Sequence, residues 1–82
     1  MEKLDRLLAD LEAGEIPKAS VSELCAAGLA AGRPDVLPAP YDRPGEAWRR
    51  LNEEQRAWVR RISPERAGEA AAAAEHAETA WH

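Results

Sequence analysis

Two short stretches of the sequence place tryptophan beside paired arginines: residues 47–52 read AWRRLN, and residues 57–63 read AWVRRIS. Guanidinium groups bind phosphates and carboxylates through paired hydrogen bonds, and tryptophan and arginine are enriched at the energetic centres of protein interfaces. The pattern predicts a basic, aromatic-flanked helical surface within residues 43–66 that would contact phosphates or an acidic groove of a partner. The candidate contact residues are Trp48, Arg49, Arg50, Arg56, Trp58, Arg60 and Arg61.

The same tryptophans also fit a hydrophobic core. Trp48, Leu51, Gln55, Trp58 and Ile62 recur at intervals of three and four residues, the spacing of a helix–helix seam. In that arrangement both indoles are buried, and the arginines form a solvated face paired with acids at helical spacing. Those acids are Glu46, Glu53 and Glu54. We favour the core position for the tryptophans and keep the interface as the alternative.

The residue types and their spacing give little support for a catalytic, metal-binding or cofactor site. His76 and His82 are six residues apart, which is not the i, i+4 spacing of a helical metal pair, and Cys25 is the only cysteine. The glycines, at positions 14, 28, 32, 45 and 68, are too scattered for a phosphate-binding loop. We therefore expect no enzymatic activity, no metal site and no cofactor.

Residues 20–37 begin like a DNA-reading helix-turn-helix but cannot complete one. Its second helix would fall on residues 33–38, where Pro34 and Pro38 prevent a helix. The net charge of −4 also disfavours nucleic acid as the partner.

The charge is unevenly distributed. Residues 1–35 carry seven acids and four bases, residues 42–66 carry seven arginines and five acids, and residues 67–82 carry three acids and no lysine or arginine. The acidic ends supply candidate phosphate-mimicking faces on the first and last helices. The candidates are Glu2, Asp5, Asp10 and Glu12 on the first, and Glu69, Glu75 and Glu78 on the last.

Two helices are predicted in the first 32 residues. In residues 2–13 the leucines at 4, 7, 8 and 11 lie on one helical face, and Gly14 and Pro17 end the helix. Ser20 and Glu23 have the spacing of a capping box, which opens a second helix over about 21–31. We expect Gly28 in that helix to let another backbone approach closely.

Prolines shape the middle of the chain. Residues 33–44 contain four prolines, which predict a stiff connector without regular structure, packed through Val36, Leu37 and Tyr41. Asp42 or Arg43 should cap the following helix.

The C-terminal part should contain two or three helices. Asn52 and Gln55 form a second capping signature, which favours two short helices at about 44–51 and 53–62 over one continuous helix. Ser63 and Pro64 should open a last, alanine-rich helix to about residue 80, with Trp81 as its only large anchor. Its alanine face suits either a dimer seam or packing within the chain.

We therefore predict an all-α fold, a compact bundle of four or five short helices in a single domain, residues 1–82. Residues 1–32 form an N-terminal helix pair, residues 33–44 a proline-rich connector, and residues 45–82 the C-terminal helices. With so few large apolar side chains, either nearly all are buried or a second copy completes the core as a homodimer. A lone cysteine and the lack of a signal peptide or membrane-length apolar run predict a cytoplasmic protein that does not enter a membrane.

The functional expectation is a non-enzymatic protein–protein interaction module whose partner is another protein or protein complex. Small acidic inhibitors, adaptors and accessory subunits are of this type, and phage-encoded inhibitors of host complexes are one example. The alternatives are a nucleic-acid-associated protein that uses the Arg/Trp-rich segment 43–66, or a helical homodimer with a structural role.

Overall fold

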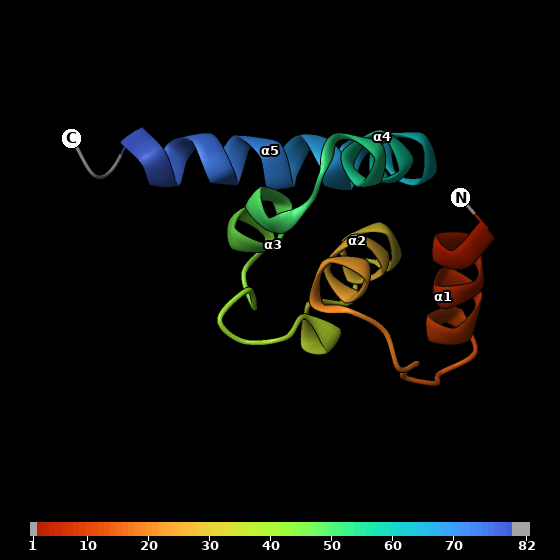
Figure 1. Cartoon of the computed structure of the whole chain (residues 1–82). Coiled ribbons are helices and arrows are strands. Elements are labelled where there is room, and N and C mark those ends of the chain that lie inside the picture. Colours follow the sequence, from red (N-terminus) through yellow and green to blue (C-terminus); the bar gives the residue numbers. More distant parts are fainter. Residues whose placement is uncertain (1, 80–82) are drawn as a thin grey trace.

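The computed structural model describes residues 2–79, with backbone alone for residues 76–79. It contains five α-helices and one 3-10 helix, and the described residues form no strand: α1 (Glu2–Glu12), α2 (Val21–Ala31), η1 (Pro34–Val36), α3 (Pro44–Arg50), α4 (Glu53–Ile62) and α5 (Pro64–Thr79). Helices α4 and α5 lie along one side of the molecule, and α3, α2 and α1 lie side by side below them (Figure 1). The predicted all-α bundle is confirmed.

Helix α1 is held by its leucine face. Leu4, Leu7 and Leu11 are buried, and Leu8 packs against the same core. The helix ends where Gly14 adopts a left-handed φ of +86°, which side chains other than glycine's rarely tolerate. The outward positions of α1 are charged and solvated.

Helix α2 begins at the predicted capping box. The Ser20 hydroxyl accepts the Glu23 N–H, and the Glu23 carboxylate accepts the Ser20 N–H. Gly32, with φ of +69°, ends the helix. At Gly28, a Cβ would lie 2.8 Å and 3.0 Å from the side chains of Leu37 and Val36 and 3.4 Å from the Arg33 carbonyl oxygen, so the close approach expected there is made mainly by side chains.

The connector is more ordered than predicted. Residues 34–36 form the 3-10 helix η1, in which Leu37 N–H donates to the Pro34 carbonyl at 3.2 Å. Pro34 fixes its own φ and so favours this single tight turn. Val36 and Leu37 are buried and Tyr41 packs on the core, as expected.

Residues 44–62 form two helices, as predicted, and not one continuous helix. Arg43 is the residue before α3, and its side chain makes no capping hydrogen bond. Leu51 and Asn52 are extended, and Asn52 with Gln55 forms the predicted capping box of α4. The seam is correct except at its end, because Ile62 is 37% exposed while Val59 is fully buried in its place.

Helix α5 packs through its alanines. Ala67, Ala70 and Ala74 are buried against the bundle. At α3, a Cβ added to Gly45 would lie 3.0 Å from the Ala73 carbonyl carbon and 3.0 Å from the Ala74 nitrogen. The two backbones are therefore in close contact, and this alanine face is used within the chain. The predicted anchor Trp81 lies outside the described residues.

The start of α5 also differs in detail. The Ser63 hydroxyl, at the start of α5, donates to the Ala30 carbonyl of α2 at 2.9 Å. Arg66 donates to the same carbonyl at 3.0 Å. Together they satisfy the C-terminal end of α2, where carbonyls lack helical partners and cations are favourable.

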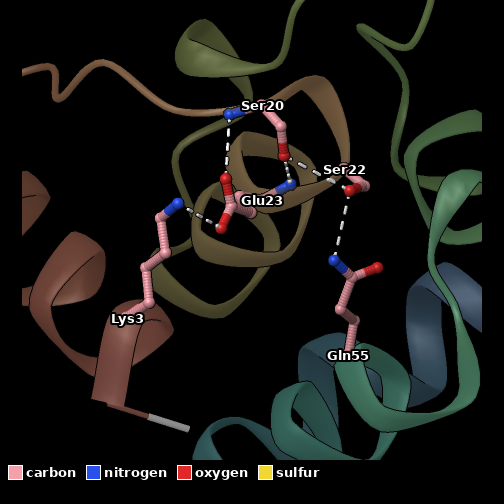
Figure 2. Close-up of polar contacts among 5 residues, drawn as sticks. All are labelled: Lys3, Ser20, Ser22, Glu23 and Gln55. Atoms are coloured by element: carbon pink, nitrogen blue, oxygen red, sulfur yellow. Dashed lines mark hydrogen bonds and ion pairs between the residues drawn. The ribbon is translucent and has the colours of Figure 1, made fainter.

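A polar network joins the N-terminal ends of α2 and α4 (Figure 2). Lys3 on α1 forms a 3.0 Å ion pair with Glu23, and the Ser22 hydroxyl on α2 accepts from Gln55 Nε2 at 3.2 Å. Because Glu23 and Gln55 each belong to a capping box, the network fixes two helix starts relative to each other.

Candidate interaction surface

Trp58 belongs to the core. Its side chain is 1% exposed, and its indole N–H donates to the Asp5 carboxylate at 2.8 Å. A buried indole nitrogen needs such an acceptor, since an unmade hydrogen bond there would be costly. Trp58 therefore joins α4 to α1 and offers no surface to a partner. The core position favoured from the sequence is correct for this residue.

Trp48 is also buried, at 5% exposed, but it supports two arginines. The guanidinium carbons of Arg56 and Arg60 lie 5.6 Å and 5.2 Å from the centre of its ring. Both distances fall within the range of cation–π attraction. We call Arg56, Arg60 and the Trp48 ring beneath them the arginine platform.

The two arginines of the platform differ in their partners. Arg56 donates to the Trp48 carbonyl at 3.2 Å and forms a 3.4 Å ion pair with Glu53. Arg60 is exposed and, within residues 2–79, has neither a hydrogen bond nor an ion pair. Its N–H donors therefore face water while the ring restrains the guanidinium. A restrained guanidinium with free N–H donors is suited to bind an oxyanion.

The other arginines of the segment point to different places. Arg49 donates to the Ala74 carbonyl at 2.9 Å and so helps to attach α5 to α3. Arg50 at the end of α3 and Arg61 near the end of α4 are exposed. Of the seven predicted contact residues, Arg50, Arg60 and Arg61 are exposed, whereas Arg56 is partly buried and links α4 to the Trp48 carbonyl of α3.

The predicted acidic face of α1 is mixed in charge. Glu2 and Glu12 are exposed, but Asp5 accepts the Trp58 indole N–H and Asp10 is partly buried. Lys3 and Arg6 lie on the same helix, so the surface is less uniformly negative than a phosphate mimic requires. On α5, Glu69 and Glu75 are exposed, and the Glu78 side chain lies outside the described residues.

The groups that could support catalysis or metal binding do not gather. In the described part of the chain, no three His, Cys, Asp or Glu side chains are placed to hold a metal ion. Cys25 is fully buried, and this burial raises the pKa of its thiol, which disfavours the reactive thiolate. The side chains of His76 and His82 lie outside the described residues. None of the described helices is long and apolar enough to span a bilayer.

A groove that the sequence did not indicate lies between α2, η1, α3 and α5. Its volume is about 330 Å³, and its apolar lining includes Leu29, Pro34, Leu37 and Pro44. Arg66 and Glu69 of α5 add opposite charges. Because the groove forms where four separate elements meet, no local sequence pattern predicts it.

Comparison of the chain with protein-family models, curated proteins and solved structures gave no significant match.

Proposed function

We propose that this protein is a non-enzymatic protein–protein interaction module, of the adaptor or inhibitor type, that binds an acidic surface of another protein through the arginine platform. The observation that carries the proposal is the stacking of Arg56 and Arg60 on the buried Trp48 ring. Arg50 and Arg61, exposed on the same two helices, would add positive charge to the contact.

Restraint of the guanidinium groups favours binding. A free arginine side chain loses rotamer freedom when it binds, and that loss costs about 1.5–2 kcal/mol. Stacking on an indole that is itself fixed in the core removes part of this loss before the partner arrives. Arginines held over an aromatic ring therefore suit an interaction hot spot better than solvated arginines do.

The partner's chemistry follows from the charges. Arg60 forms no ion pair with a carboxylate of the described chain, whereas Arg56 forms one with Glu53. A carboxylate-bearing protein surface would supply the missing partner for Arg60. The net charge of −4 opposes the long phosphate track of a nucleic acid, so we favour a protein.

The test is affinity purification of the tagged chain from its native source, with nuclease added throughout. We expect one stoichiometric protein partner that survives nuclease treatment and is lost with the double variant Arg56→Glu/Arg60→Glu. The control is Arg6→Glu on α1, which is exposed and should leave recovery of the partner unchanged.

Three outcomes would overturn the proposal. One is that the purification recovers no stoichiometric partner, and another is that the partner binds the double variant as well as the wild type. The third is recovery that depends on nucleic acid, with RNA or DNA shifted by the pure protein at low salt and released as salt rises. That outcome would favour the alternative function.

A further inference from the structure

The groove between α2 and α5 contains an arginine whose position is fixed by backbone contacts. A Cβ added to Gly32 would lie 2.6 Å from both Cζ and Nε of Arg66 and 2.9 Å from Nη2, so the guanidinium rests directly against the glycine. Nη1 donates to the Ala30 carbonyl at 3.0 Å and lies 3.4 Å from the Ser63 hydroxyl. In the described chain, Nε and Nη2 have no partner. Nη1 is held by hydrogen bonds, whereas the Nε–Nη2 edge is open in the sense that it has no acceptor in the described chain.

The other charges of the groove are arranged differently. Arg33 is occupied, since it forms a 2.7 Å ion pair with Asp35 and donates to the Leu11 carbonyl. Glu69 is exposed and forms no ion pair within the described residues. The groove therefore presents one open cation and one open carboxylate beside an apolar floor. Its complement has an anion, an N–H donor and an apolar side chain close together.

We propose that this groove binds the carboxyl-terminal residue of a partner chain, where that residue has a large apolar side chain. The terminal carboxylate would take the open edge of Arg66, and the residue's own amide N–H would donate to Glu69. The side chain would lie among Leu29, Leu37 and Pro44. Capture of a chain terminus by fixed donors is an established mode of peptide recognition.

The size of the groove supports a single residue. Sites for drug-sized ligands span roughly 300–1,000 Å³, and the groove, at about 330 Å³, lies at the lower limit. An acidic residue inside a partner chain would fit less well. Its side chain is the carboxylate itself, so the apolar side chain would have to come from another residue. This inference does not depend on the arginine platform, which involves different side chains.

The test uses three small probes against the full chain, labelled with ¹⁵N and followed by NMR. The first probe, N-acetyl-L-phenylalanine, has every group that the groove would recognise. The second, N-acetyl-L-phenylalaninamide, lacks only the carboxylate, and the third, N-acetylglycine, lacks only the side chain. We expect saturable shifts at Gly28, Gly32 and Leu37 with the first probe. Loss of the charge-assisted hydrogen bonds should weaken the amide about tenfold or more, and N-acetylglycine should bind more weakly still.

Variants locate the binding. Arg66→Gln should abolish the preference for the acid over the amide, whereas Arg6→Gln, with the same change of charge on α1, should preserve it. If Arg66→Gln does not fold, the comparison of the three probes on the wild-type chain decides alone. Equal binding of acid and amide, shifts confined to other surfaces, or no shift at about 20 mM probe would overturn the proposal.

Discussion

The indole nitrogen of Trp58 and the carboxylate of Asp5 are joined by a 2.8 Å hydrogen bond that spans 53 residues of sequence. Trp58 is 1% exposed, whereas Asp5 lies on the solvated side of α1. This bond links α4 to α1. Helix α1 lies at the edge of the bundle (Figure 1). Asp5, a candidate interaction residue by sequence, therefore has a structural role.

A double-mutant cycle tests this bond. Trp58→Phe should lower the free energy of unfolding by about 1–3 kcal/mol, because it removes the N–H donor and leaves a small void. Asp5→Ala should also destabilise, since it leaves the buried indole nitrogen without an acceptor. Urea unfolding of both single variants and the double variant should give a coupling of about 1–2 kcal/mol. Additive effects would show that the bond contributes nothing to stability.

Two glycines at helical positions should respond in opposite ways to alanine. Gly68 in α5 is exposed and has no atom within 4 Å of an added Cβ. Gly68→Ala should therefore stabilise the protein by about 0.5–1 kcal/mol, because alanine loses less backbone entropy in a helix. Thermal or urea unfolding measures the change, and a loss of stability would contradict the placement of Gly68.

Gly45→Ala is the matched change at a contact. Its Cβ would meet the backbone at Ala73 and Ala74, so α3 and α5 would have to separate. We expect destabilisation of about 1–3 kcal/mol, typical of overpacking. An unfolding midpoint equal to that of the wild type would show that α3 and α5 do not approach as closely as described.

The Glu23 carboxylate links pH to stability. Its pKa lies below the ordinary value, chiefly because the Ser20 N–H donates to it, with the Ser20 hydroxyl and the Lys3 ammonium adding to the effect. A carboxylate with a lowered folded pKa stabilises the protein above the unfolded pKa of about 4.5, and this stabilisation is lost as pH falls through the folded value.

The corresponding variant should lose part of that dependence. The free energy of unfolding of the wild type should fall more steeply below about pH 4.5 than that of Glu23→Gln. Lys3→Met should show a smaller reduction, since the Ser20 N–H remains in place. Identical pH profiles for the wild type and Glu23→Gln would rule out this contribution.

Most of the helical structure could be predicted because its signals are local. The Ser20–Glu23 and Asn52–Gln55 capping boxes, the Gly14 stop and the leucine face of α1 each act within one or two turns. These features depend on spacing along the chain, which the sequence states directly.

Predictions were less complete where distant residues meet. The sequence could not show that Arg56 and Arg60 stack on Trp48, because this depends on how α4 is oriented relative to α3. Ile62 fits the seam by spacing, but α4 turns Val59 inward instead. The groove around Arg66 was missed for the same reason, since its walls come from four elements.

Site-specific photo-crosslinking to the partner tests the proposed binding surface most directly. Benzoylphenylalanine at Arg61, on the exposed part of α4, should crosslink to the partner, whereas the same group at Glu12 on α1 should not. The Arg56→Glu/Arg60→Glu change should abolish the crosslink from position 61. Crosslinks from position 12 and none from position 61 would contradict binding through the arginine platform and place the partner on the face of α1.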